Sequence, residues 1–163
     1  MLTSKKILLM MMGIGATMQV VGQDHAEEKS FVFFENSQIQ HDSLRYQSYA
    51  VKAGEFIVFQ WLTDNGGEPG NYSVAESVMA FQVENGVEEF ELKDEEIFSH
   101  QGLYAQRCRC QDRRIQPIHS GVIHGKKMKS GNWMIEIDTV SIGLITGKTY
   151  HLLLNGEFKS AKG

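Results

Sequence analysis

Hydrophobic and polar residues alternate along much of this chain, a pattern typical of β-strands with one buried face. In residues 132–140, Trp133, Ile135 and Ile137 fall on one face and mainly polar side chains on the other. Residues 55–62 differ, because apolar side chains occupy both alternating sets of positions. Such a segment is typical of a strand that is covered on both faces. The two patterns together predict strands that pack in layers.

Short apolar or aromatic runs between turn residues predict further strands at 31–34, 45–51, 77–84, 87–92, 102–110 and 149–154. Asn85-Gly86 predicts a tight hairpin turn between 77–84 and 87–92, because both central residues of a type I′ turn need positive φ. Asn155-Gly156 predicts a second turn, into a short final strand. No segment has apolar residues at a sustained helical spacing. The pattern therefore predicts an all-β fold, a single antiparallel β-sandwich domain of about eight strands.

The chain begins with a segment that has the layout of a secretory signal peptide. An uncharged apolar run from Ile7 to Val21 follows Lys5 and Lys6 and leads into a polar, acidic stretch. The run is short for a transmembrane helix, although an uncleaved signal anchor is the alternative. We expect cleavage after Gly22. The predicted organisation is a signal peptide at 1–22, a mobile N-terminal tail at 23–30 and the β-sandwich domain at 31–163.

Composition and charge narrow the possible partners. The 163 residues carry a net charge of −4, which becomes −6 when Lys5 and Lys6 leave with the signal peptide. No second long apolar segment follows, so we expect no membrane span after cleavage. An exported, acidic domain without interleaved aromatic and basic residues is not typical of nucleic-acid binding. We therefore predict a secreted or periplasmic protein.

Cys108 and Cys110 are the only cysteines, separated by Arg109. On an extended strand their Cα atoms would lie about 6.5 to 7 Å apart, at or beyond the limit for a disulfide. An oxidising compartment favours pairing, so we expect a disulfide at a bend where residues 111–112 begin a turn. Two unbridged thiols and a thiol-redox role are alternatives.

A metal site is a further interpretation of the same residues. Two thiolates and two imidazoles make a tetrahedral zinc site. The candidate ligands are Cys108, Cys110, His119 and His124.

Charge is unevenly distributed along the chain. Seven acidic residues lie between Glu84 and Glu96. Seven basic residues follow, namely Arg107, Arg109, Arg113, Arg114, Lys126, Lys127 and Lys129. They could form an anion-binding face for a glycan, a lipid headgroup or an acidic protein. We favour the other interpretation, in which the two stretches lie on neighbouring strands and neutralise each other. That interpretation predicts cross-strand pairing of Glu88, Glu89 and Glu91 with Arg107, Arg109 and Arg113.

The sequence contains no recognisable catalytic or cofactor-binding motif, neither a nucleophile elbow nor a zinc-protease helix nor a phosphate-binding glycine loop. We therefore expect an exported, non-catalytic β-sandwich that binds a protein or an envelope component and uses no cofactor. The alternatives are an exported metal-binding protein and a hydrolase acting on envelope polymers.

About half of the chain, from Ser77 onward, resembles the C-terminal β-domain of the periplasmic shaft protein of gliding-motility and type IX secretion machines. Residues 78–83, 130–138 and 147–148 carry this resemblance. The present chain is far shorter, and a cleavable signal replaces the family's membrane anchor. The resemblance implies a non-enzymatic scaffold or interaction domain, and it carries over no functional residue.

Overall fold

The computed structural model describes residues 28–41, 48–64, 76–108 and 110–161. Within these ranges nine strands and one short helix follow in the order β1 (Glu28–His41), β2 (Tyr49–Ala53), β3 (Phe56–Asp64), β4 (Glu76–Glu84), β5 (Glu89–Lys93), α1 (Glu95–Ser99), β6 (Leu103–Arg107), β7 (Gln116–Lys127), β8 (Trp133–Ile142) and β9 (Thr149–Ser160). The predicted all-β fold is confirmed. The predicted signal peptide and its cleavage site lie outside the described residues.

The strands form one continuous hydrogen-bonded sheet in the order β2-β1-β3-β4-β6-β7-β8-β9, with β5 attached to β7. The pairs are antiparallel, as predicted, apart from β1 and β9. These two strands run parallel, with Val32 opposite Lys159 and Phe33 opposite Ser160. Because β1 pairs with both β3 and β9, the sheet returns on itself.

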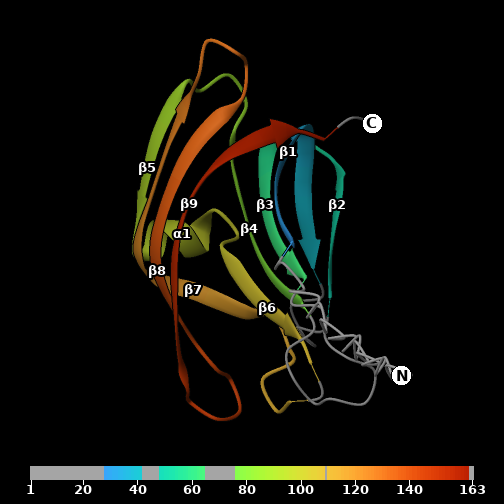
Figure 1. The fold of residues 1–163 in the computed structure, drawn as a ribbon, viewed down its shortest axis with the longest axis vertical. Helices are drawn as coiled ribbons and strands as arrows, with labels where there is room; N and C mark the ends of the chain where they lie inside the picture. The colour runs from blue at the N-terminus through green and yellow to red at the C-terminus, as the bar shows by residue number, and fades with distance from the viewer. Residues whose placement is uncertain (1–27, 42–47, 65–75, 109, 162–163) are drawn as a thin grey trace, which may run out of the picture.

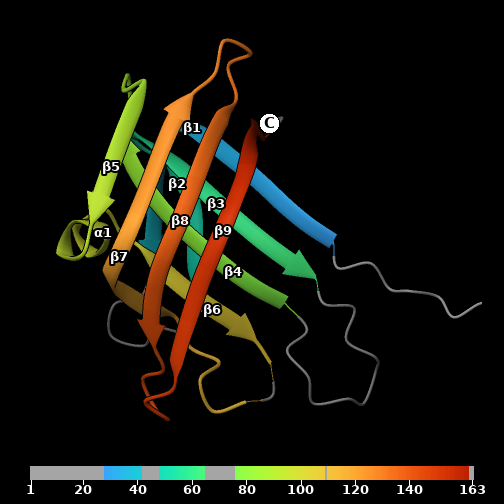
Figure 2. The same cartoon turned by 60° about the vertical axis from the view of Figure 1, so that its left-hand side comes forward.

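The sheet folds over into two layers whose strands cross at an angle (Figures 1 and 2). One layer contains β1 to β4 with β6, and the other contains β5, β7, β8 and β9. Strand β7 passes from one layer to the other. It pairs with β6 at its start and with β8 beyond, where the register shifts between Ile118 and Ser120.

The main hydrophobic core lies between the layers and is centred on Phe59, which is fully buried. Its ring centroid lies 5.1 Å from that of Phe81, 5.3 Å from that of Trp133 and 5.7 Å from that of Phe90. A second, smaller cluster consists of Ile39, Val58, Ala80, Leu103 and Ile115. Adjacent residues of β3 thus belong to different clusters, which confirms that this strand is covered on both faces.

Strand β8 has the alternation that the sequence predicted. Trp133, Ile135 and Ile137 are buried, whereas Met134 and Glu136 are exposed. This arrangement follows from the pleat, which turns successive side chains to opposite faces. One face of β8 therefore belongs to the core and the other to solvent.

The predicted hairpin at Asn85-Gly86 is wrong, although the turn itself is present. Gly86 has a φ of +87°, which favours glycine. Strands β4 and β5 do not pair with each other, however, because β4 lies between β3 and β6 while β5 pairs with β7. The turn instead leads the chain from one layer into the other.

The predicted turn at Asn155-Gly156 is also wrong, because β9 continues through both residues to Ser160. Gly156 lies against the ring of Phe31, and a Cβ added there would come within 2.7 Å of the ring atom Cε1. The glycine therefore allows a close approach within the core rather than a reversal of the chain.

The remaining differences concern element boundaries. Strand β1 begins at Glu28, so residues 28–30, which we assigned to the tail, are in a strand. Helix α1 and the full length of β7 were not predicted. Five residues are too few for a helical pattern to be recognised. Over the described ranges, no helix has the length and apolar character needed to cross a membrane.

Candidate functional site

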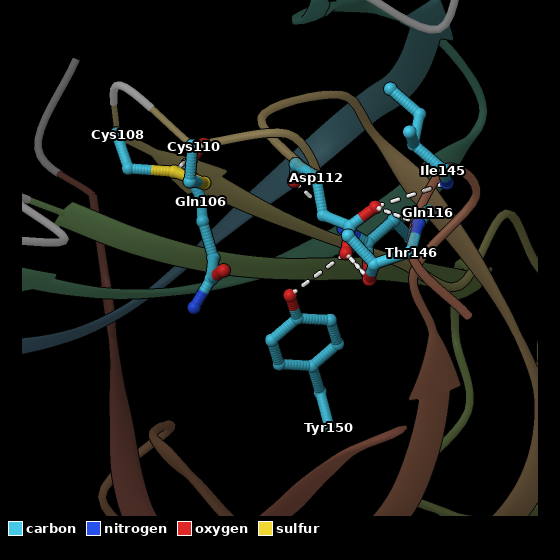
Figure 3. Close-up of a disulfide and its surroundings, with 8 residues drawn as sticks. All are labelled: Gln106, Cys108, Cys110, Asp112, Gln116, Ile145, Thr146 and Tyr150. Atoms are coloured by element: carbon cyan, nitrogen blue, oxygen red, sulfur yellow. Dashed lines mark hydrogen bonds between the residues drawn. A yellow bond between two sulfur atoms is a disulfide. The ribbon is translucent and has the colours of Figure 1, made fainter. Parts of the chain in front are cut away.

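Two connections meet at one end of the molecule, the β6–β7 segment and the β8–β9 loop (Figure 3). In the first, Cys108 and Cys110 form a disulfide, as predicted. Their Cα atoms lie 5.2 Å apart, closer than neighbouring same-face residues of a straight strand. The chain therefore bends directly after β6, which ends at Arg107 rather than continuing to Cys110.

Asp112 connects this segment to the β8–β9 loop. The residue as a whole is only 3% exposed. It accepts hydrogen bonds from the backbone N–H of Ile145 at 3.0 Å and of Thr146 at 3.2 Å. The Thr146 hydroxyl and, at 3.1 Å, the Tyr150 hydroxyl also donate to it. Four donors from one loop and the following strand thus converge on a single carboxylate.

These contacts shift the pKa values of Asp112 and Tyr150. The Thr146 hydroxyl is the main cause that lowers the pKa of Asp112, and the two backbone N–H groups and Tyr150 act in the same direction against the opposing effect of burial. Burial raises the pKa of Tyr150, and its bond to the Asp112 carboxylate adds to this effect. The pair is therefore held as an anionic carboxylate that accepts from a neutral phenol.

Gln116 and Gly143 lie directly against Asp112, and Ser141 contacts Gln116. Gln116 is fully buried, and its Nε2 donates to the backbone oxygen of Asp112 at 2.8 Å. The Ser141 hydroxyl donates to Gln116 Oε1 at 3.4 Å. Gly143 lies so close to Asp112 that an added Cβ would come within 2.2 Å of Oδ2. A larger residue at position 143 would therefore displace the carboxylate.

The end of β8 and the clamped loop after it expose apolar side chains. Ile142, Leu144 and Ile145 are 59%, 52% and 56% exposed, and we call these three residues the apolar tip. Single exposed side chains of this size are common on proteins, whereas several that lie close together are typical of interaction surfaces.

Three cations flank the apolar tip, and we call Arg113, Arg114 and Lys148 the basic flank. Both arginines line a shallow hollow together with Cys110 and Ile145. Lys148 Nζ lies 5.2 Å from the centroid of the Tyr150 ring.

The predicted metal ligands are not brought together. Cys108 and Cys110 are bonded to each other. His119 Nδ1 lies 3.2 Å from the carboxylate of Glu95 in α1. His124 Nε2 lies 3.3 Å from the carboxylate of Glu89 in β5. No group of three or more histidine, cysteine, aspartate or glutamate side chains suited to a metal ion occurs in the ranges that the structure describes.

The predicted neutralisation of acidic by basic residues is correct for Lys126 and Lys127 and wrong for Arg107 and Arg113. Strand β5 lies beside β7, so Glu89 pairs with Lys126 at 3.4 Å and Glu88 with Lys127 at 3.6 Å. Hydrogen bonds from His124 and then Lys126 lower the pKa of the Glu89 carboxyl.

The predicted partners of the three arginines must be corrected. Arg107 pairs with Glu76 of β4 at 2.9 Å, because β6 lies beside β4. Glu91 pairs with Lys93 of its own strand. Arg109 lies outside the described residues. Arg113 is exposed just before β7, away from β5.

The described members of the seven predicted anion-binding residues therefore do not form one face. Arg113 and Arg114 precede β7, whereas Lys126 and Lys127 end it and Lys129 follows in the next turn. The two groups lie at opposite ends of a twelve-residue strand. Only the group near Arg113 adjoins the apolar tip.

Other hollows lie elsewhere on the described part of the fold. One, beside α1, encloses about 210 Å³ and has mainly apolar walls that include Phe98, Leu103 and Ile115. Another is a shallow depression over the outer face of β7, β8 and β9, lined by residues that include His124, Glu136, Asp138 and Leu153. Its polar side chains lie on an open sheet face, where nothing in the geometry selects a base or a nucleophile.

Sequence reasoning did not identify Asp112, the residue that organises the candidate site. The available signal was that Asp112 is the only acid among the bases from Arg107 to Lys129. A single acid in a basic stretch is a candidate for a buried, hydrogen-bonded carboxylate. Its partners lie more than 30 residues away in sequence, and only the fold brings them close.

Comparisons with family models, with curated proteins and with solved structures return no match. The resemblance to the periplasmic shaft protein thus stays a prediction.

Proposed function

We propose that this protein is an exported, non-catalytic binding or scaffold module of the cell envelope or secreted fraction, with a β-sandwich architecture. The two packed layers support the description as a sandwich. Its partner is a protein or an envelope component, which it contacts through the apolar tip and the basic flank. One observation carries the proposal: a buried carboxylate, Asp112, holds a loop whose apolar side chains point into solvent.

A fixed loop favours binding for a physical reason. Ordering a flexible loop on association costs conformational entropy, and a loop that is already ordered avoids most of that cost. Asp112 and the neighbouring disulfide supply the order before any partner arrives. Exposed isoleucine and leucine side chains gain free energy when a partner covers them.

The two alternatives from the sequence have less support. His119 and His124 each contact a different glutamate, Glu95 and Glu89, which does not favour the metal-binding alternative. The open depression over β7, β8 and β9 does not favour a hydrolase, because it does not enclose a substrate. The binding module is therefore the function that we propose.

Site-specific photo-crosslinking in the cells that produce the protein tests this proposal. A photoreactive residue at Leu144 should yield a discrete crosslinked product. The same residue at Leu153, which is 79% exposed on the outer face of β9, serves as the matched control and should not yield that product. Absence of any product from Leu144, or identical products from both positions, would count against the proposed surface.

Export is tested separately. The N-terminus of the protein recovered from the envelope or the medium should be Gln23, as expected for cleavage after Gly22. A protein that retains its first residues and stays inside the cell would contradict the proposed location.

A further inference from the structure

We propose that the apolar tip and the basic flank form a docking site for an anionic lipid surface. This inference rests on the proposed function and specifies the envelope component. Ile142, Leu144 and Ile145 would enter the interfacial region of the bilayer. The cationic side chains behind them would contact the lipid headgroups.

The shape of this region suits a flat surface. The β8–β9 loop lies at one end of the long axis of the molecule, and both views show it protruding beyond the strands (Figures 1 and 2). The three apolar side chains lie within four consecutive positions, at the end of β8 and the start of this loop. A protruding group of this kind can enter a membrane interface without rearrangement of the strands behind it.

Most backbone N–H groups of the loop are hydrogen-bonded within the protein, as an apolar environment requires. Lipid offers no hydrogen-bond partners, so buried backbone groups must be satisfied within the protein. The N–H groups of Ile145 and Thr146 donate to the Asp112 carboxylate. The N–H of Gly143 donates to Lys148, that of Gly147 to Gly143, and that of Lys148 to the Thr146 hydroxyl.

Five of the six N–H groups in residues 143–148 are thus bonded internally. A loop that recognises a protein through its main chain would instead keep such donors free for the partner. The observation therefore favours lipid over a protein that pairs with the loop backbone.

The distribution of ion pairs among the basic residues also favours an anionic surface. In the described part of the chain, Arg113 and Arg114 make no ion pair. By contrast, Arg107, Lys126 and Lys127 are each paired with a glutamate. Unpaired positive charge is therefore present beside the apolar tip of a protein whose net charge is −4. An anionic surface would attract this end and repel the acidic remainder, which orients the molecule.

Vesicle sedimentation tests the inference. The probes are vesicles of phosphatidylcholine alone and vesicles of phosphatidylcholine and phosphatidylglycerol in equimolar amounts. Wild-type protein should bind the anionic vesicles and not the neutral ones, and added salt should weaken the binding. The double variant Leu144→Ser, Ile145→Ser should lower the partition coefficient by about tenfold or more. Its matched control is Met134→Ser, Leu153→Ser, which removes exposed apolar side chains from the sheet face and should bind like wild type.

A second pair of variants separates local from overall charge. Arg113→Gln with Arg114→Gln should weaken binding by roughly tenfold. Lys126→Gln with Lys127→Gln removes the same charge from the other end of β7 and should have little effect. All four double variants alter exposed or half-buried side chains, and circular dichroism should show each of them folded.

Equal binding by tip and control variants would overturn the inference, as would equal binding to neutral and anionic vesicles. Failure of wild-type protein to bind anionic vesicles would also overturn it. In that case a tip-dependent crosslink to an acidic protein would leave the proposed binding function intact. Absence of both vesicle binding and a tip-dependent crosslink would remove both proposals.

Discussion

Tyr49 makes the stability of this protein depend on alkaline pH in a way that can be calculated. The side chain packs against the second hydrophobic cluster, and its hydroxyl accepts a hydrogen bond from Gln60 Nε2. Burial raises the pKa of Tyr49 from 10.0 to about 12, while the Gln60 bond and the charge of Arg107 oppose that rise. The raised pKa means that the folded state favours the neutral phenol.

The sign of the effect follows from proton binding. Below pH 10.0 Tyr49 is protonated in both folded and unfolded protein, so its contribution is fully present. As the pH rises from 10.0 to about 12, the unfolded protein loses the proton first, and stability falls. A difference of one pKa unit corresponds to 1.36 kcal/mol, so the loss is about 1.4 kcal/mol near pH 11 and ~2.7 kcal/mol once both states have ionised.

Urea unfolding of wild type and Tyr49→Phe across this pH range tests the calculation. Near neutral pH the variant should be less stable by about 1 kcal/mol, because Gln60 loses an acceptor. Phenylalanine does not ionise, so the variant escapes the alkaline loss and the two stability curves should cross between about pH 10 and 11. Curves that stay parallel up to about pH 12 would refute the assignment of a raised pKa to Tyr49.

Further predictions concern the core, the disulfide and the loop clamp. Phe59→Ala should lower the free energy of unfolding by about 3 to 5 kcal/mol and Phe59→Leu by less, because leucine fills more of the space between the layers; equal losses in urea unfolding would contradict this. Cys108→Ser with Cys110→Ser should stay folded and lose stability at or below the low end of the usual ~2 to 4 kcal/mol, since the ring is small. Non-reducing mass spectrometry should find no alkylatable thiol in wild type, and two free thiols would contradict the disulfide. Asp112→Asn should speed amide hydrogen exchange in residues 143–148, and unchanged exchange would contradict the clamp. Because the pKa of Asp112 is lowered, protection in wild type should be complete above the ordinary aspartate range and lost only as the pH falls through the depressed value.

Sequence patterns predicted those parts of the fold that depend on local burial. The alternation in β8 and the two-sided burial of β3 were correct, because each reflects the environment of single side chains. The same reasoning could not identify the partner of β5. A turn at Gly86 is encoded locally, whereas the choice between β4 and β7 as a neighbour depends on how the whole sheet folds over.

The candidate site was predicted only in part, for a similar reason. The disulfide follows from the number of cysteines and the expected compartment. The hydrogen bonds to Asp112 come from a loop that lies far away in sequence. The pattern of polar residues around position 112 does not predict that Ile145 and Thr146 are the donors. Leucine and isoleucine are usually buried, so the sequence alone would not predict that Leu144 and Ile145 are exposed. Only the structure shows this.

The parallel pairing of β1 with β9 has a consequence for how the protein is made. The N–H of Ala161, just beyond β9, donates to Phe33 of β1 at 2.9 Å, so this seam joins segments separated by most of the chain. The seam cannot form on the ribosome until β9 has been synthesised, and a nascent chain would expose the aromatic residues of β3 and β8 until then. Contacts between such distant segments slow folding. The unfolded chain should therefore persist long enough for chaperones to engage it before the sheet closes.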